Sequence, residues 1–331
     1  MRVLIAGASG AIGTPLTRQL IAAGHQVVGI SRSQSNAERL RGAGAEAVVA
    51  DVLDRENLLA AVRGVRADAV MHQLTALGTT NMRAALQGTN SLRTTGTANL
   101  LAAARAVGAH RFLTQSIVLG YGYHDHGPHV ITEDDPFAEP VSGKVGEAVA
   151  AIGSTEEQVF SADELEGVAL RYGFFYGQDS MTRMIVDLLR KRRLPVPSSG
   201  GFANFIYLDD AAAATVAALE KGRAGQAYNI VDDEPVRWGD YLDTFAAELG
   251  ARRPWRVPSW MLRPIPYVHA MMTTSMRVSN AKAKRELGWA PAAPTYREGI
   301  PLAARANSLK WLDSVSIPGI IPGILTLDGG P

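Results

Sequence analysis

Three glycines near the N-terminus, Gly7, Gly10 and Gly13, are spaced three residues apart, between an apolar run and an amphipathic one. In a nucleotide-binding loop the first glycine allows a tight turn, the second lets a diphosphate approach the backbone, and the third permits close packing of the next helix. The free amides at the start of that helix carry partial positive charge and stabilise a diphosphate without a lysine. The pattern predicts a dinucleotide site formed by the loop residues Gly7, Ser9, Gly10, Ala11, Ile12 and Gly13.

The segments around the loop decide between this site and a glycine-rich surface turn. Residues 2–6 are a short apolar run, which predicts a buried strand. Residues 14–23 have the apolar spacing of a helix, and 25–30 predict a second strand. The order strand, loop, helix and strand within about thirty residues is the context that a nucleotide site needs.

The end of the second strand carries the residues that select the cofactor. About twenty residues past the glycines, a site that prefers NAD has an acidic residue for the ribose 2′-hydroxyl. Here Ser31 and Arg32 stand at that place. A guanidinium offers fixed donors and a permanent charge that suit a 2′-phosphate. The sequence therefore predicts NADP(H) as the cofactor, the alternative for Arg32 being an exposed loop residue.

The composition of the chain limits its other partners. Its 331 residues, 47% of them hydrophobic, can bury a large core, and a net charge of +1 favours neither nucleic acid nor an anionic membrane. The absence of cysteine excludes disulfides and thiolate chemistry, and no apolar run approaches the length of a membrane span. We expect a cytoplasmic protein that acts on a small molecule, with no nucleic-acid or membrane partner. The sequence leaves its oligomeric state open.

Strand-like and helix-like segments alternate along most of the chain, which predicts an α/β fold with a Rossmann-like, doubly wound parallel sheet. We expect the cofactor-binding domain to comprise residues 1–173 and 205–234. A smaller, discontinuous substrate-binding region is expected from 174–204 and 235–300, and a C-terminal tail from 301–331.

The Gly-x-x-Gly-x-x-Gly spacing, Phe205 to Ala212 and Tyr228 to Asp232 resemble motifs of the extended short-chain dehydrogenase/reductases. This superfamily includes nucleotide-sugar epimerases, dehydratases and ketoreductases, and the resemblance covers residues 2–299. It implies further cofactor contacts at Asp51, Val52, Leu74, Thr75, Ala76, Gln115, Ser116, Tyr172, Gly173, Phe174 and Phe175. From the residues alone, Asp51 could equally cap the helix that is expected to begin near Asp54.

Two motifs of the superfamily are altered in this chain. The helix that carries Asn-x-x-Gly-Thr has Arg93 at the asparagine position, with Asn90 one turn earlier. The position of the catalytic serine or threonine falls on Ile117. None of the nine tyrosines is followed four residues later by the lysine that normally lowers the tyrosine pKa. Alignment puts Val149 and Gly153 at the tyrosine and lysine positions.

Two interpretations of the missing pair remain open. In the first, hydride transfer persists because a nicotinamide held against a carbonyl supplies much of the acceleration. The proton then comes from Ser116, Tyr121, water or an acidic hydroxyl of the substrate, such as a phenol beside the ketone of an aromatic polyketide. In the second, the protein binds NADP(H) as a sensor or scaffold. We favour the first, with Ser116 and Tyr121 as the catalytic residues.

Residues 252–276 favour a large, flat substrate. The segment holds two tryptophans, four methionines and four prolines, which suit a lid over a planar apolar ligand, although a hydrophobic core has the same composition. Its four arginines keep a nucleotide sugar open as the substrate of an epimerase or dehydratase. With the missing pair, the chain resembles the ketoreductases of angucyclinone pathways, as in simocyclinone biosynthesis. That resemblance implies NADPH-dependent reduction of a ketone on a bulky aromatic polyketide in antibiotic biosynthesis.

The loop from Tyr121 to His129 has several histidines that invite a metal site. Metal ligands have to converge on one point, and no helix is expected there to bring them together. A solvated loop explains these residues better. We predict no metal.

Overall fold

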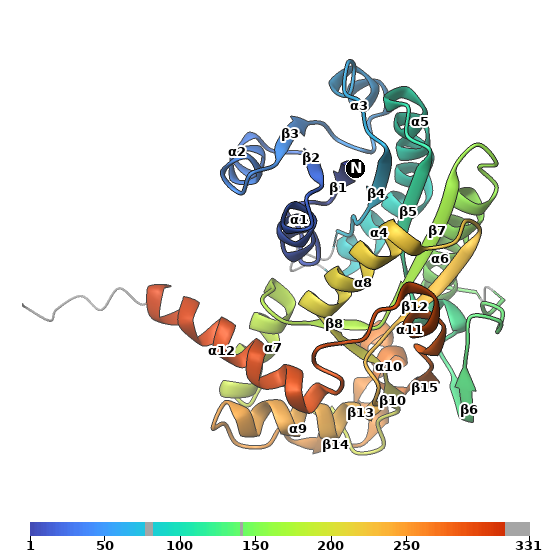
Figure 1. Cartoon of the computed structure of the whole chain (residues 1–331). Helices are drawn as coiled ribbons and strands as arrows, with labels where there is room; N and C mark the ends of the chain where they lie inside the picture. The colour runs from blue at the N-terminus through green and yellow to red at the C-terminus, as the bar shows by residue number, and fades with distance from the viewer. Residues whose placement is uncertain (77–81, 140–141, 315–331) are drawn as a thin grey trace, which may run out of the picture.

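The computed structural model of the protein describes residues 1–76, 82–139 and 142–314. It is built around a seven-stranded parallel sheet with the order β12-β7-β5-β4-β1-β2-β3 (Figure 1). The strands of this sheet are β1 (Arg2–Ala6), β2 (Gln26–Ser31), β3 (Glu46–Val49), β4 (Ala69–His72), β5 (Arg111–Ile117), β7 (Glu166–Tyr172) and β12 (Gln226–Ile230). The Rossmann-like fold expected from the sequence is confirmed.

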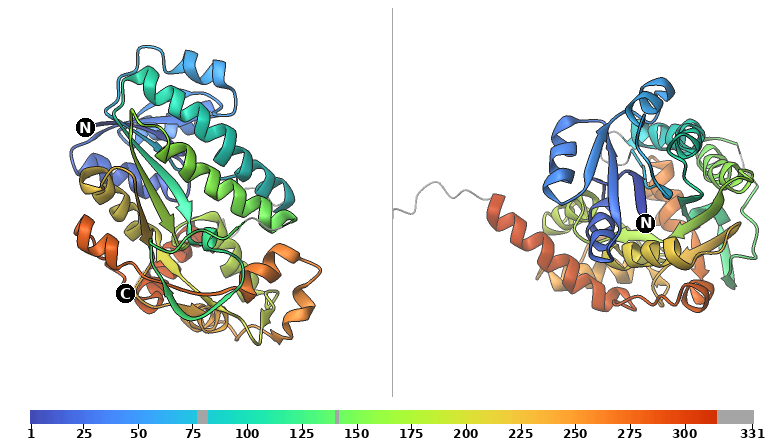
Figure 2. Two further views of the ribbon diagram at one scale, coloured as in Figure 1. Left: turned by 90° about the vertical axis from the view of Figure 1, so that its right-hand side faces the viewer. Right: turned by 45° about the horizontal axis from the view of Figure 1, so that its top comes forward.

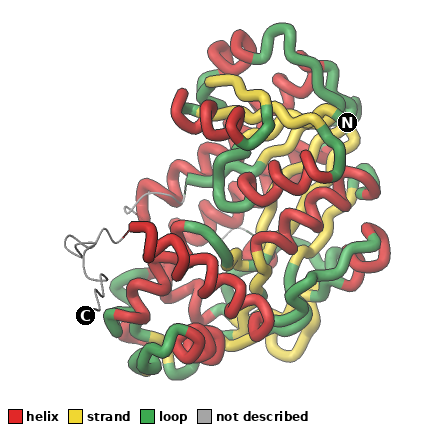
Figure 3. Tube along the Cα trace, turned by 60° about the vertical axis from the view of Figure 1, so that its left-hand side comes forward, coloured by secondary structure: helices red, strands yellow, loops and turns green. Residues whose placement is uncertain are grey.

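Helices cover both faces of the sheet, as Figure 3 shows. Alternate residues of β1 enter different cores, because side chains along a strand point to opposite faces. Val3 and Ile5 pack on the side of α1 and α8, whereas Leu4 and Ala6 pack on the side of α3 and α5. Burial on both faces is why this strand is a continuous apolar run. The flanking helices are α1 (Gly13–Ala22), α2 (Gln34–Gly42), α3 (Arg55–Ala61), α4 (Met82–Ser91), α5 (Thr97–Val107), α6 (Lys144–Phe160), α8 (Leu208–Lys221) and α11 (Ala281–Leu287).

A π-helical turn, η1 (Leu92–Gly96), joins α4 to α5. The helix expected from residue 92 onward therefore exists, with a wider turn at its start. The Arg93 carbonyl accepts a hydrogen bond from Thr97 Oγ1 at 2.7 Å and another from Thr155 Oγ1 of α6 at 3.0 Å. Side-chain donors that take up backbone carbonyls stabilise such a turn, and π-turns are frequent at functional sites. Figure 2 shows α5 and α6 side by side on the sheet.

The remaining elements lie beyond the carboxyl ends of the large sheet (Figure 1). They include four two-stranded sheets, which pair β8 with β11, β9 with β14, β10 with β13, and β6 with β15. Their bounds are β6 (Asp125–Ile131), β8 (Phe174–Tyr176), β9 (Val196–Pro197), β10 (Phe202–Ala203), β11 (Phe205–Tyr207), β13 (Val236–Arg237), β14 (Arg256–Val257) and β15 (Ser275–Val278). The helices are η2 (Val118–Tyr121), α7 (Ser180–Arg190), α9 (Trp238–Glu248), η3 (Ser259–Leu262), α10 (Pro266–Thr273) and α12 (Tyr296–Ser314).

A third core of aromatic residues holds these elements together. Phe205 of β11 stacks on Tyr241 of α9 with ring centroids 3.8 Å apart, and Trp238 packs edge-on against Phe205. The tryptophans of the expected lid are not part of this core, because Trp255 and Trp260 are 62% and 61% exposed. Large exposed aromatic side chains suit a surface that meets a ligand better than one that supports a fold. The division into domains stays a prediction, and α12 crosses the boundary placed at residue 301.

Candidate active site

The glycine loop forms a tight cradle between β1 and α1. Gly7 has φ +96°, and a Cβ there would lie 2.5 Å from the Gln73 carbonyl oxygen. A Cβ on Gly13 would lie 2.0 Å from the Gly7 carbonyl oxygen, so α1 begins against the backbone of the loop. Gly10 and Ala11 are exposed, Ser9 is partly exposed, and Ile12 is buried. The cradle thus fits a diphosphate, with the Gly10 and Ala11 backbone open to it.

Arg32, which follows β2, is exposed to solvent. Ser31 is buried, and its hydroxyl bonds the Ser33 carbonyl at 3.1 Å. Arg32 is exposed and forms none of the ion pairs among the described residues. Its charge is available to a 2′-phosphate, although the exposure alone also fits an ordinary loop residue.

The adenine side of the expected site is formed by the end of β3. The Asp51 carboxylate accepts a hydrogen bond from the Leu53 amide at 3.0 Å and stays exposed. Asp54, not Asp51, caps α3, since its carboxylate accepts from the Asn57 amide. Val52 is buried, and its carbonyl accepts from Asn99 Nδ2 at 2.8 Å. The structure leaves the Asp51 side chain free for a ligand contact.

The carboxyl ends of β4 and β5 meet beside the glycine loop. Gln115 Nε2 donates to the Leu74 carbonyl, and the Ala76 amide donates to Thr89 Oγ1 at 3.0 Å, while Thr75 is exposed. The hydroxyl of Ser116 is buried and has no hydrogen-bond partner among the residues that the structure describes. A buried hydroxyl without a hydrogen-bond partner costs free energy. At this edge of the sheet, the Ser116 hydroxyl can donate a hydrogen bond to a bound ligand.

The segment expected under the nicotinamide follows β7. The Tyr172 hydroxyl lies 2.6 Å from Thr215 Oγ1 and accepts from Gln73, so this side chain belongs to the core. Gly173 is buried against the backbone, because a Cβ there would lie 2.7 Å from the Asn204 carbonyl oxygen. Phe174 and Phe175 keep part of their surface exposed. The structure brings this backbone to the same sheet edge as Ser116, since β5 and β7 are neighbours.

Tyr121 lies in a buried network and is poorly placed to donate a proton. Its hydroxyl donates to Asn229 Oδ1 at 2.9 Å and accepts from Arg171 at 2.8 Å. Glu156 of α6 binds Arg171 through two nitrogens, the shorter bond being 2.7 Å. Burial raises the pKa of Tyr121 to about 12, although Arg171 and Asn229 oppose the shift. The role of Tyr121 as a catalytic residue stays a prediction; in the structure its hydroxyl is held by Arg171 and Asn229.

Two groups near this edge were not identified as site residues from the sequence. Arg93 was noted only because it replaces the asparagine of a superfamily motif, and that replacement was the signal in the sequence. Burial lowers the pKa of its guanidinium, whose electrostatic neighbours are Tyr267 and Tyr123. Asp232, after β12, is buried, and burial raises its pKa to about 9, although a hydrogen bond from the Glu234 backbone opposes the shift. Nothing in the sequence around Asp232 indicated this.

The α6 helix carries the positions aligned with the usual tyrosine and lysine. Val149 is buried there, and a Cβ on Gly153 would meet nothing within 4 Å. Among the described residues, no group of three His, Asp or Glu side chains is placed to hold a metal ion. In the same part of the chain, no helix is long and apolar enough to cross a membrane.

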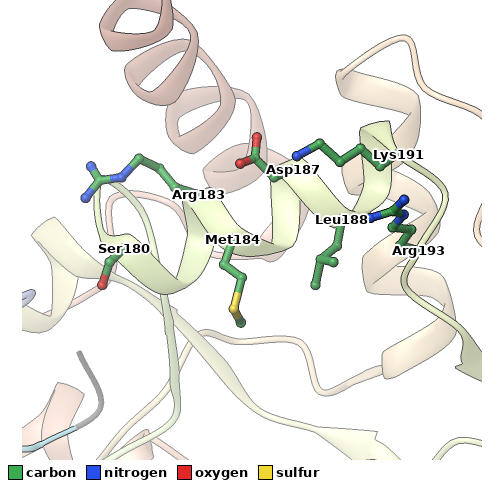
Figure 4. A pocket seen from close by; sticks show the side chains of 7 residues that line it. All are labelled: Ser180, Arg183, Met184, Asp187, Leu188, Lys191 and Arg193. Carbon is green, nitrogen blue, oxygen red and sulfur yellow. The ribbon is translucent and has the colours of Figure 1, made fainter. Parts of the chain in front are cut away.

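A separate basic hollow runs along α7, outside every residue assigned above. It is lined by Ser180, Arg183, Met184, Asp187, Leu188, Lys191 and Arg193 (Figure 4). Figure 4 shows Arg183, Asp187 and Lys191 on one side of the helix, and Met184 and Leu188 on the other. Such a charged, shallow surface is typical of an exposed amphipathic helix.

A model of the NAD dependent epimerase/dehydratase family matches residues 3–231. The chain belongs to this family. A 3-diazoavenalumate denitrifying reductase of a Streptomyces species is 38% identical over 312 residues, which are 91% of this chain and 99% of that protein. A 2-alkyl-3-oxoalkanoate reductase of Stenotrophomonas maltophilia is 29% identical over 264 residues, covering 76% of this chain and 77% of that protein. This member of the family is an NAD(P)-dependent oxidoreductase.

Several solved structures share the fold. A dTDP-glucose 4,6-dehydratase from Streptomyces venezuelae with NAD and TYD bound superposes with a TM-score of 0.77 at 20% identity, covering 94% of this chain and 98% of that one. A UDP-glucose 4-epimerase from Thermotoga maritima with UDP-glucose has a TM-score of 0.76 at 20% identity, covering 94% of this chain and all (100%) of that one. At these identities the likeness concerns the fold.

Proposed function

We propose that the protein is an NADPH-dependent reductase of a bulky aromatic substrate and that it works without a proton-donating tyrosine. The observation that carries the proposal is the buried, unbonded hydroxyl of Ser116 at the carboxyl end of β5. NADPH, when bound, supplies a hydride. The glycine loop holds its diphosphate, Arg32 its 2′-phosphate, and the backbone after β7 its nicotinamide.

In this proposal Ser116 donates a hydrogen bond to the oxygen of the substrate ketone and holds the carbonyl in place. The hydrogen bond strengthens as negative charge develops on that oxygen. The proton is supplied by water or by a phenol beside the ketone, because no tyrosine has a lysine four residues on and Tyr121 is bound to Arg171. The proposed reaction is the ketone reduction predicted from the sequence. Its proposed substrate is an aromatic polyketide, and its proposed location is the cytoplasm.

The missing tyrosine–lysine pair also favours a second hydride acceptor, a diazo compound. The relative that is 38% identical is named a 3-diazoavenalumate denitrifying reductase. Replacement of an aryl diazonium group by hydrogen forms a C–H bond from hydride as the C–N bond breaks and N₂ leaves. That reaction consumes no proton, so it needs neither tyrosine nor lysine. Ketone reduction consumes one proton for each NADPH.

The experiment follows NADPH oxidation with polycyclic phenolic ketones, aryl diazo compounds and nucleotide sugars in parallel. We expect turnover with a phenolic ketone, lost when the neighbouring hydroxyl is methylated, or turnover with the diazo compound and release of N₂. Ser116→Ala should lower turnover on a ketone by about 100-fold, the usual cost of one hydrogen bond to a developing oxyanion. Ser35→Ala, on the exposed α2, is the matched control. Epimerisation of a sugar without net oxidation, or binding of NADPH without oxidation across the panel, would overturn the proposal.

A further inference from the structure

Arg93 is held where three elements meet at the edge of the active site. The carbonyl of the preceding residue, Leu92, lies 3.1 Å from Nε2 of His72, the last residue of β4. The carbonyl of Arg93 itself accepts a hydrogen bond from Thr155 of α6 at 3.0 Å. The π-helical turn is therefore fixed on both sides of Arg93, and the guanidinium starts from a rigid base.

The guanidinium of Arg93 is surrounded by protein but has no acidic partner. No carboxylate of the described residues forms an ion pair with it. The residue nevertheless keeps part of its surface accessible. The other arginine buried near this edge, Arg171, is bound by both oxygens of Glu156. A buried charge is normally paired, so the surroundings of Arg93 lack an anion.

Two tyrosines from different elements, Tyr123 and Tyr267, are the electrostatic neighbours of this guanidinium. Tyr123 follows η2 at the end of β5, and Tyr267 lies on α10 within the segment expected to cover the substrate. Their ring centroids are 6.1 Å apart with planes tilted by 57°. Burial and the interaction with Tyr267 raise the pKa of Tyr123, so its hydroxyl keeps its hydrogen near neutral pH. The cluster presents hydrogen-bond donors and one positive charge.

We propose that Arg93, Tyr123 and Tyr267 bind a carboxylate of the substrate. The planar guanidinium offers two parallel donors that match the two oxygens of a carboxylate, and the tyrosine hydroxyls donate to their remaining lone pairs. The inference rests on the proposed reductase, for which it names the substrate as an aromatic acid. It also gives α10 a role, since Tyr267 contacts the bound acid from the lid side. A diphosphate is the competing oxyanion, and the test separates the two.

The experiment is calorimetric titration of the NADPH-loaded protein with 4-hydroxycinnamate and with its methyl ester. We expect the acid to bind at least about tenfold more tightly than the ester, and Arg93→Gln to remove that difference while leaving ester binding unchanged. Arg93→Lys, which keeps the charge but not the fork, should retain part of the preference. Arg83→Gln, an exposed arginine on α4, is the matched control and should change nothing.

Three results would overturn the inference. Equal binding of acid and ester by the unaltered protein would remove the carboxylate site. Equal loss of both ligands in Arg93→Gln, together with a lower unfolding temperature, would assign Arg93 a structural role. Displacement of the acid by UDP-glucose at lower concentration would favour a diphosphate. Because the readout is binding, a failure of the proposed reduction would leave the acid preference intact and so be distinguishable.

Discussion

The two sides of the active site are built in different ways. On the cofactor side the site is formed by the backbone. Gly7 and Gly13 are required there because a Cβ at either would collide with a neighbouring carbonyl. On the other side, at the ends of β5 and β7, long side chains cross between elements, as in the chain from Glu156 through Arg171 to Tyr121. A backbone site follows from local sequence, whereas a side-chain network depends on which distant residues the fold brings together.

The largest effect is expected from breaking the side-chain network. Glu156→Gln leaves the buried Arg171 charge without its partner and should lower the free energy of unfolding by about 3–5 kcal/mol. Denaturant unfolding measures the change. Glu46→Gln, which breaks the more exposed pair with Arg2, is the control and should have a far smaller effect. Equal effects of the two variants would contradict the importance given to the network.

Substitution of a loop glycine should weaken cofactor binding. A Cβ on Gly13 would lie 2.0 Å from a backbone oxygen, so Gly13→Ala has to open the loop. We expect a loss of stability of about 1–3 kcal/mol and a much weaker binding of NADPH, measured by calorimetry. Gly42→Ala, where a Cβ would meet nothing within 4 Å, should leave cofactor binding unchanged. Unchanged NADPH affinity in Gly13→Ala would remove the loop from the site.

Substitution of Arg32 tests the choice of cofactor without disturbing the fold of the glycine loop. Arg32→Asp should weaken NADPH binding by about 10- to 100-fold, which corresponds to the loss of charged hydrogen bonds worth about 1.5–3 kcal/mol. NADH has no 2′-phosphate, so its affinity should hold or rise. Titration with both cofactors measures the ratio. Losses of equal size would show that Arg32 does not select the phosphate.

A separate, pH-dependent effect concerns Asp232, whose pKa burial raises to about 9. The folded protein keeps a proton that the unfolded chain releases at about pH 4, so this group makes the protein less stable as pH rises between those values. Asp232→Asn removes that dependence, so its stability relative to the unaltered protein should rise between pH 5 and pH 8, by up to about 1.4 kcal/mol per pH unit. Unfolding at the two pH values measures it. A difference that is constant with pH would contradict an uncharged Asp232.

The sequence predicted the parts of the molecule that local physics determines. The bounds of β1 agree with the expected range, and those of α1 and β2 differ from it by one residue at each end, since apolar runs and glycine stops specify them directly. The sequence did not predict that Tyr121 would be bound to Arg171, fifty residues away in the chain. Nor could it predict the burial of Asp232, which depends on the packing of α9, β8 and β11 around it.

The residues expected from the family resemblance fall into the same two classes. The loop residues and those at the ends of β4, β5 and β7 gather at one edge of the sheet, and their roles stay predictions that binding experiments can test. Arg93 was visible in the sequence only as an exception to a motif. Its surroundings became clear once the fold placed Tyr123 and Tyr267 beside it.

The central claim is that hydride passes from NADPH to a carbon atom of an aromatic substrate. The most direct measurement is the transfer of deuterium from NADPH labelled at C4 to product, followed by mass spectrometry with the phenolic ketone, the aryl diazo compound and a nucleotide sugar. The account predicts one deuterium in the product of one of the two aromatic substrates for each NADPH consumed. Deuterium in neither aromatic product, or exchange into the sugar without net oxidation of NADPH, would contradict it.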